Sequence, residues 1–175
     1  MKKLLVVVDF QNDFVDGALG FDGAKNLENI IENKIIEFKS NSYDIVFTLD
    51  THENNYLQSE EGKKLPIPHV IKGTKGHEIY GKIKKYATDY PCLEKYTFGS
   101  DKLMEFIKNK PFYNEIELCG LVSSICVISN AIIAKAASPN SHIAIDAKAT
   151  DSYDKTMQEK CFDILEHLHV EIRNR

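Results

Sequence analysis

The chain has 175 residues, of which 43% are hydrophobic and 27% charged, and its formal net charge is -4 at pH 7. This composition is typical of a globular protein with one core, and the acidic balance without a basic cluster argues against a nucleic-acid partner. No apolar run approaches the ~20 residues of a membrane span, so no membrane partner is expected. Only five apolar residues, from Leu4 to Val8, precede Asp9, too few for a signal peptide, which predicts a cytoplasmic location. In that compartment the four cysteines, which lack CxxC spacing, are expected to be free thiols.

The first predicted element is a strand over residues 3–9, an uninterrupted apolar run that ends at Asp9. A short apolar run without alternation is typical of a strand covered on both faces, as in a parallel sheet. A loop that contains Gly17 and Gly20 follows through residue 20. Apolar residues at helical spacing then predict a helix over residues 24–39.

The middle of the chain contains a second strand over residues 45–49, which Asp50 closes. A long polar loop is expected over residues 53–68, and loops of that length are usually functional. The remaining predicted elements of this part are short: an extended piece at 69–73, a helix at 76–87, an extended segment at 91–95 and a helix that Ser100 caps.

The last third begins with a strand from residue 114 that bends at Gly120 and leads into a helix through Ser123 and Ser124. A strand at 142–146, a helix around 157–168 and a strand at 170–172 complete the chain. Strands that alternate with helices predict an α/β fold: a doubly wound, mainly parallel sheet with helices on both faces. We expect it to form a single domain over residues 1–175.

Cys126 follows the predicted strand and turn, in the first turn of the helix. The unpaired N–H groups and the dipole of a helix N-terminus favour a thiolate, so Cys126 is a candidate nucleophile. The alternative is that Cys126 only packs, as most buried cysteines do.

Polar side chains also follow the predicted strands at Asp9 and at Asp50-Thr51-His52. The carboxyl ends of parallel strands meet at one edge of a sheet, where ligands of α/β proteins bind. Asp50 and His52 point to the same side of an extended chain. With His69 they offer one oxygen and two nitrogens, the pattern of a catalytic metal site with open positions. The alternative is a surface histidine that hydrogen-bonds a loop.

Asp9 is either a group that caps backbone N–H groups at the strand end or a general base. Lys95 is either one of many solvated lysines or a buried charge beside Asp9. A cluster of Asp9, Lys95 and Cys126 makes chemical sense, because the ammonium group lowers the thiol pKa and the carboxylate takes the proton. Backbone N–H groups of residues 120–126 are candidates to hold an oxyanion.

Five segments in the same order resemble the isochorismatase-like cysteine hydrolases and, within them, the nicotinamidases. The resemblance covers nearly the whole chain. The segments are residues 8–14 (VDFQNDF), 48–52 (TLDTH), 68–74 (PHVIKGT), 94–100 (EKYTFGS) and 119–127 (CGLVSSICV).

The resemblance implies a catalytic triad of Asp9, Lys95 and Cys126. It also implies a cis peptide bond after Gly120, between Leu121 and Val122, which directs the N–H groups of Val122 and Cys126 into an oxyanion hole. Ser123-Ser124 departs from the family, whose members often have Thr-Asp or Thr-Glu at these positions.

The nicotinamidases carry one divalent metal ion, and Asp50, His52 and His69 match its ligands. Some members use another histidine in the loop that follows, but residues 53–68 contain none. Others use a glutamate, for which Glu61 is preferred here, with Glu60 or water as alternatives. Zinc is the expected ion, with manganese or iron as alternatives.

The activity implied is the hydrolysis of nicotinamide to nicotinate and ammonia through a thioester, a step of NAD salvage. Phe14 and Phe98 would contact the ring of this small-molecule amide, although packing in the core is an equally good role for them. The alternatives are another small amide, such as a pyrazine amide or a carbamoyl compound, or a non-catalytic α/β ligand-binding protein. The oligomeric state stays open, with a homo-oligomer as one alternative.

Overall fold

A six-stranded parallel sheet forms the centre of the molecule in a computed structural model that describes residues 1–175. The strand order is β3-β2-β1-β4-β5-β6. The sheet is therefore wholly parallel rather than mainly parallel, and the predicted α/β class is confirmed. The strands are β1 (Lys3–Val8), β2 (Asp44–Asp50), β3 (Cys92–Lys95), β4 (Glu115–Leu121), β5 (His142–Asp151) and β6 (Glu171–Arg173).

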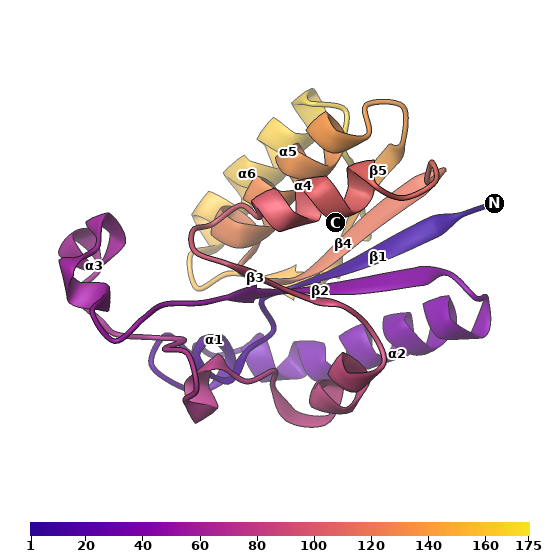
Figure 1. The fold of residues 1–175 in the computed structure, drawn as a ribbon. Coiled ribbons are helices and arrows are strands. Elements are labelled where there is room, and N and C mark those ends of the chain that lie inside the picture. Colours follow the sequence, from indigo (N-terminus) through magenta and orange to yellow (C-terminus); the bar gives the residue numbers. More distant parts are fainter.

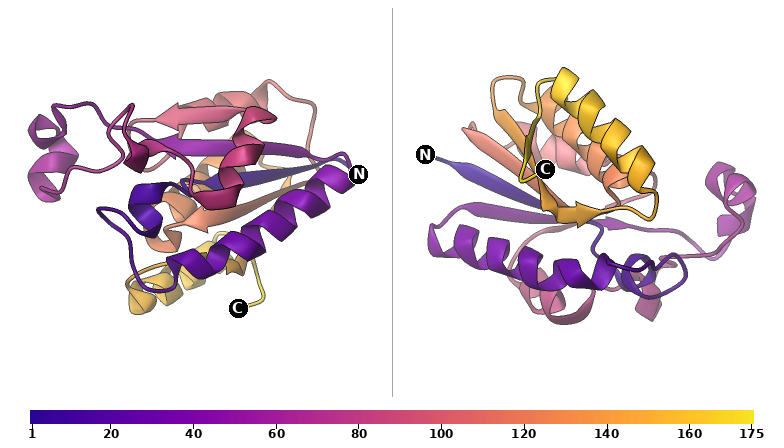
Figure 2. Two further views of the ribbon diagram at one scale, coloured as in Figure 1. Left: turned by 90° about the horizontal axis from the view of Figure 1, so that it is seen from below. Right: turned by 180° about the vertical axis from the view of Figure 1, so that it is seen from behind.

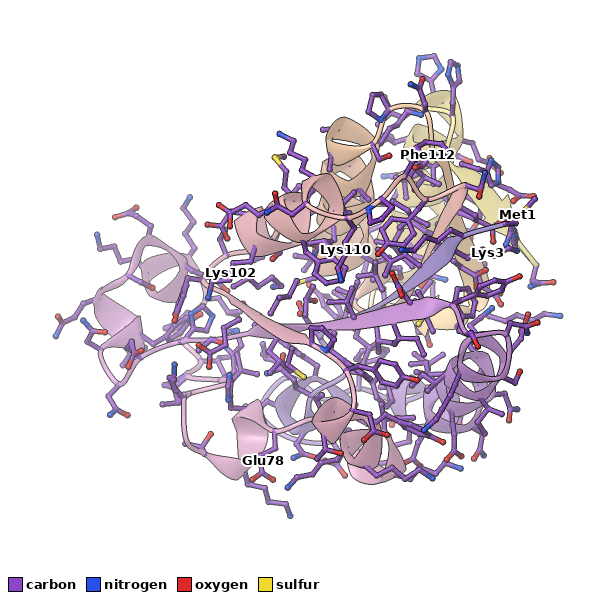
Figure 3. The ribbon with its side chains drawn as sticks, turned by 45° about the vertical axis from the view of Figure 1, so that its right-hand side comes forward. Met1, Lys3, Glu78, Lys102, Lys110 and Phe112 are labelled. Atoms are coloured by element: carbon purple, nitrogen blue, oxygen red, sulfur yellow. The ribbon has the colours of Figure 1, made fainter.

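Helices cover both faces of the sheet (Figures 1 and 2). On one face lie α4 (Asp101–Lys108), α5 (Ile128–Ala137) and α6 (Lys155–His167). On the other lie α1 (Asn12–Val15), α2 (Leu27–Ser40) and the turns of residues 75–88. Lys102 of α4 and Glu78 lie on opposite sides of the sheet (Figure 3). The short helix α3 (Glu60–Lys64) stands beyond the carboxyl ends of the strands. No helix is both long and apolar enough to cross a membrane.

The apolar run of β1 is buried from Leu4 to Val8 and supplies both cores, as predicted. Leu5 and Val7 pack in the core that includes α2, whereas Leu4, Val6 and Val8 pack in the core beneath α4, α5 and α6. Successive side chains of a strand point to opposite faces, so a strand with a helix layer on each side is apolar at every position.

Several local predictions need correction. The loop of residues 10–20 contains α1, and the loop of residues 53–68 contains a 3₁₀ turn (Tyr56–Gln58) and α3. The helix predicted at 76–87 is two 3₁₀ turns, Lys75–His77 and Gly81–Thr88. The piece at 69–73 is a turn with a single bridge between Ile71 and His52. These segments are short, so tertiary contacts outweigh their weak local preferences.

The chain departs from regular geometry at the end of β4 and in the turn that follows. Gly120 has a φ of 111°, and a Cβ atom there would lie 2.0 Å from the carbonyl oxygen of Val8. Only glycine fits such an approach, which confirms the bend predicted at this residue. A π-helical turn, Ser123–Val127, then precedes α5, so the regular helix begins only at Ile128. The Leu121–Val122 peptide bond is cis, as the resemblance implied.

Candidate active site

Three side chains from different parts of the chain meet near the carboxyl ends of the strands. Asp9 follows β1, Lys95 ends β3, and Cys126 lies in the π-helical turn. Lys95 Nζ lies 2.7 Å from Asp9 Oδ2 and 3.7 Å from Cys126 Sγ. All three residues are at most 5% exposed. The structure thus brings together the Asp9, Lys95 and Cys126 cluster that the sequence suggested.

Neighbouring polar groups orient the cluster. The Thr48 hydroxyl donates a 2.6 Å hydrogen bond to Asp9 Oδ1. Lys95 also donates to the carbonyl oxygen of Thr97, at 3.0 Å. Asp9 has a φ of 45°, a backbone conformation that is uncommon outside glycine. Such conformations cluster at functional sites, where the surrounding contacts hold them.

The ionisation of Cys126 differs from the sequence-based expectation. Burial raises the pKa of the Cys126 thiol well above its ordinary value, and the nearby charge of Lys95 only partly opposes this effect. The expectation of a lowered thiol pKa is therefore not met. Burial alone would lower the pKa of Lys95, but the adjacent carboxylates of Asp9 and Asp50 raise it above its ordinary value.

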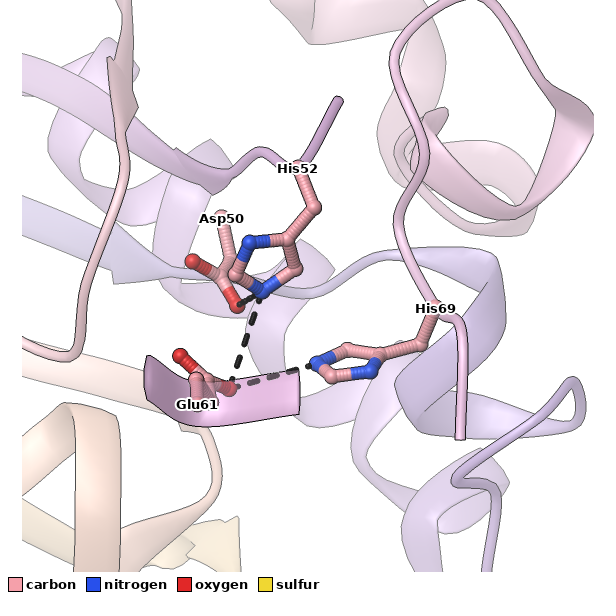
Figure 4. Close-up of side chains that lie close together, drawn as sticks. All are labelled: Asp50, His52, Glu61 and His69. Carbon is pink, nitrogen blue, oxygen red and sulfur yellow. Dashed lines mark ion pairs between the residues drawn. The ribbon is translucent and has the colours of Figure 1, made fainter. Parts of the chain in front are cut away.

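Four other side chains surround a common point next to this cluster (Figure 4). Asp50, His52, Glu61 and His69 each offer one ligand atom, and these atoms lie within 4.8 Å of one another. His52 Nε2 is 3.6 Å from both Asp50 Oδ2 and Glu61 Oε1, and His69 Nε2 is also 3.6 Å from Glu61 Oε1. These separations are too long for hydrogen bonds. They are close to the roughly 3.4 Å between ligand atoms that share a tetrahedral ion at about 2.1 Å.

The histidines of this group are oriented as metal ligands would be. His69 Nδ1 lies 2.8 Å from the carbonyl oxygen of Ile67. A hydrogen bond donated to that oxygen leaves the lone pair of Nε2 free to face Glu61. His52 Nε2 is buried and has no hydrogen-bond partner. A buried nitrogen without a partner is unfavourable unless something else binds it, so the donor set fits a divalent cation.

The geometry also separates the two candidate glutamates. Glu61 is a member of the group, and the adjacent imidazoles of His52 and His69 lower its pKa to about 2. The side chain of Glu60 is 80% exposed and pairs with Lys63 instead. The Ser59 hydroxyl caps α3 by accepting a hydrogen bond from Gly62 N, which fixes the start of the helix that carries Glu61.

A cavity of about 430 Å³ opens over both groups. Phe14 and Phe98, the residues expected to contact a substrate ring, line it, and Phe14 also belongs to the core and packs edge-on against His69. Val122 and Cys126, the two residues proposed for an oxyanion hole, line it too. The other lining residues are Ala18, Leu19, Gly20, Phe21, Asp50, Glu61, Leu65, His69, Ile125 and Tyr153.

Sequence reasoning gave no role to Gln11, although it stands in one of the quoted motifs. Its side chain is fully buried, accepts a hydrogen bond from Asp50 N and donates to Asp50 O, both at 2.9 Å. Gln11 therefore fixes the backbone of a candidate metal ligand. Its place in the motif of residues 8–14, two positions after Asp9, is the signal that could have found it.

Asn130 was also missed, because it lies within an apolar helix pattern. Its amide group donates to the carbonyl oxygens of Phe98 and Cys126 and accepts from Ser100 N. It thereby joins the loop that carries Phe98 to the helix that carries Cys126. The cavity wall formed by Phe21 and Tyr153 was missed as well, since these residues come from loops far apart in the chain.

The family model of the isochorismatase domain matches residues 3–174 of the chain. The chain belongs to the isochorismatase family. A curated relative, the uncharacterized isochorismatase family protein PncA of Bacillus subtilis (strain 168), is 31% identical over 145 residues, which cover 75% of this chain and 78% of the relative.

Solved structures show the same fold over almost the entire chain. The nicotinamidase/pyrazinamidase PncA of Bacillus subtilis superposes with a TM-score of 0.85 at 25% identity and covers 99% of this chain and 100% of that chain. The pyrazinamidase of Pyrococcus horikoshii, solved in complex with zinc, has a TM-score of 0.84 at 21% identity, with 98% of each chain covered.

Proposed function

We propose that this protein is a metal-dependent cysteine amidohydrolase that converts nicotinamide to nicotinate and ammonia. The observation that carries the proposal is that one cavity is lined both by a buried thiol, backed by a carboxylate and an ammonium group, and by three members of a four-residue set that could hold a metal ion. The solved nicotinamidase/pyrazinamidase with the same fold supports this substrate class.

In the first half of the reaction, Asp9 takes the proton of the Cys126 thiol. Sγ attacks the amide carbon, and the carbonyl oxygen becomes an oxyanion that the N–H groups of Val122 and Cys126 would hold. Asp9 then gives the proton to the amide nitrogen. The C–N bond breaks, ammonia leaves, and an acyl group stays on Sγ as a thioester.

In the second half, Asp9 removes a proton from a water molecule that attacks the thioester carbon. The C–S bond breaks, the proton returns to Sγ, and the acid leaves. Lys95 stays protonated throughout, because Asp9 and Asp50 lie 2.7 and 3.2 Å from its Nζ. Its role is to stabilise the negative charge that moves between Asp9 and Sγ.

Asp50, His52, Glu61 and His69 would hold the metal ion, with zinc as the expected ion and manganese or iron as alternatives. The bound ion would supply an open coordination position for a ring nitrogen of the substrate. Phe14 and Phe98 would pack against the ring and exclude water around the reacting amide. The ligand residues and the aromatic side chains thus orient the amide toward Cys126.

Ammonia release from a panel of amides tests the proposal. The panel contains nicotinamide, pyrazinamide, a carbamoyl amine and benzamide, which lacks a ring nitrogen. We expect turnover of nicotinamide and pyrazinamide and little turnover of benzamide. Exclusive turnover of the carbamoyl compound would replace the proposal with the second candidate, an amidase for another small amide. No turnover of any amide by the zinc-loaded protein would contradict the proposal and favour a ligand-binding protein.

A further inference from the structure

The contacts of Asp13 link two segments that border the candidate active site. Asp13 lies in α1 and is half-buried. Its Oδ2 accepts a 2.7 Å hydrogen bond from the backbone N–H of Val70, and its Oδ1 accepts one of 3.2 Å from the N–H of Ala18. Its own carbonyl oxygen accepts a further bond, of 2.8 Å, from Leu19 N. One residue therefore holds the turn after His69 and the loop that lines the cavity at Ala18 and Leu19.

Val70 connects Asp13 to two of the proposed metal ligands, His69 and His52. It directly follows His69, and its carbonyl oxygen accepts a 3.1 Å hydrogen bond from His52 N. Its φ is 41°, a left-handed conformation that is a genuine outlier for a β-branched residue. Such conformations are unfavourable and persist only where the surrounding contacts hold them in place.

Contacts of the Val70 side chain and backbone hold this residue in its left-handed conformation, and Asp13 supplies one of them. The Val70 side chain is fully buried in the core on the α2 face. The carboxylate of Asp13 accepts the hydrogen bond of the Val70 N–H and so holds the backbone as well. Gly76 leaves the room for this carboxylate, because a Cβ atom at residue 76 would lie 2.1 Å from Asp13 Oδ2.

We propose that Asp13 is a positioning residue that holds Val70 in its left-handed conformation and thereby places His69 and His52 for metal binding. The inference rests on the proposed metal site. It assigns Asp13 no contact with the substrate or with Asp9, Lys95 and Cys126. Two carboxylate oxygens are needed, since both partners are N–H donors.

Asp13→Asn is the informative substitution. An amide has the same shape but only one oxygen, so in either orientation one backbone N–H faces an NH₂ group. Metal-free wild-type protein and variants are titrated with Zn²⁺ against a chromophoric chelator. We expect Asp13→Asn to weaken zinc binding at least tenfold, the effect typical of groups that orient metal ligands. The absorption bands of the Co²⁺-loaded variant should also shift, because the ligand geometry changes.

Asn12→Ala is the matched control. Asn12 precedes Asp13 and donates a hydrogen bond to Lys75 O, so it also holds the following turn but does not contact Val70. We expect its zinc affinity to stay within about twofold of wild type. The rate at which iodoacetamide alkylates Cys126 should stay the same in both variants, since neither residue contacts the thiol.

Gly76→Ala provides a second route if Asp13→Asn does not fold, because the added methyl group displaces the carboxylate without removing it. Wild-type zinc affinity and unchanged Co²⁺ bands in a folded Asp13→Asn or Gly76→Ala protein would overturn the inference. Failure of the wild-type protein to bind zinc would instead overturn the proposed metal site, so the two failures are distinguishable.

Discussion

Asp50 and Lys95 are direct neighbours: Asp50 Oδ1 lies 3.2 Å from Lys95 Nζ, and both side chains are buried. The other oxygen of Asp50 lies 3.6 Å from His52 Nε2. One carboxylate therefore borders both the proposed triad and the proposed metal ligands. Burial raises the pKa of Asp50, and the charge of Lys95 opposes this rise. The positive charge of Lys95 thus compensates the negative charges of two buried carboxylates, Asp9 and Asp50.

Lys95→Met should therefore remove activity and stability together. Methionine keeps an unbranched, apolar side chain but leaves Asp9 and Asp50 without their cation. Removing one partner of a buried ion pair costs about 3–5 kcal/mol, and protonation of either carboxylate would relieve part of this cost. Ammonia release and urea denaturation measure the two effects. Lys39→Met, which removes the exposed pair with Asp89, should leave activity unchanged.

Cys126→Ser should lower the rate of ammonia release by at least about a thousandfold, because a hydroxyl is a far weaker nucleophile in a site built for sulfur. The melting temperature should change little. Cys92→Ala is the control, since Cys92 is half-buried in β3 and does not line the cavity. Substantial turnover by the serine variant, or equal losses in both variants, would refute the assignment of Cys126 as the nucleophile.

The pair Glu61→Gln and Glu60→Gln tests the fourth metal ligand. The amide introduced by Glu61→Gln would keep an oxygen near His52 and His69 but lose the charge, so we expect the affinity for zinc to fall about 10–100-fold. Elemental analysis after dialysis measures the metal that each variant retains. Glu60→Gln should retain the metal, because Glu60 faces solvent and Lys63. The reverse result would assign the ligand to Glu60, and no change in either would favour water.

Tyr153→Ala should raise KM for nicotinamide several-fold with little change in kcat or metal content. Tyr153 is 66% exposed, yet it lines the cavity and packs edge-on against Phe21, with ring centroids 6.3 Å apart. Aromatic pairs of this kind contribute about 0.5–1.5 kcal/mol beyond their buried area. Tyr153→Phe keeps the ring and should behave as the wild type. A fall in kcat with an unchanged KM would contradict this role.

Arg173→Met should destabilise the protein in a pH-dependent way. The guanidinium group of Arg173 hydrogen-bonds Glu115 and lowers the pKa of that carboxyl to about 2. Because the folded-state pKa lies below the unfolded value of about 4.3, this stabilisation is present above pH 4.3 and disappears as the pH falls toward 2. We expect a deficit of about 2 kcal/mol at pH 7 that shrinks through this window.

Urea denaturation at several pH values measures the deficit of Arg173→Met. Arg175→Met is the control, because the ion pairs of Arg175 are with Glu159, Asp163 and Glu166 of α6 and not with Glu115, although its guanidinium group also lies over the ring of Phe162. A deficit of Arg173→Met that is the same at pH 7 and pH 3 would show that packing, rather than charge, is lost.

Patterns that depend on near neighbours in the chain were sufficient for the fold class. The apolar run of β1 predicted a strand buried on both faces, and Gly120 and Ser100 marked a bend and a helix cap that the structure contains. The alternation in β4 was harder to interpret. Its polar positions Glu115 and Glu117 are also buried, because Lys34 and Arg173 from distant elements pair with them. Periodicity identifies the faces of a strand but not what will cover each face.

The sequence indicated which types of residue could form the site. The tertiary structure decided which particular lysine and glutamate belong to it. Lys95 looks like any other lysine in the sequence, and it is buried only because β3 pairs with β2 and brings it to Asp9 and Asp50. Glu60 and Glu61 are adjacent and chemically identical, so only the orientation of α3 separates the exposed one from the one that faces His52. The pKa of Cys126 likewise follows from its burial, which no local pattern reports. Local sequence determines conformations over a few residues, whereas burial and long-range contacts arise only when the elements pack together.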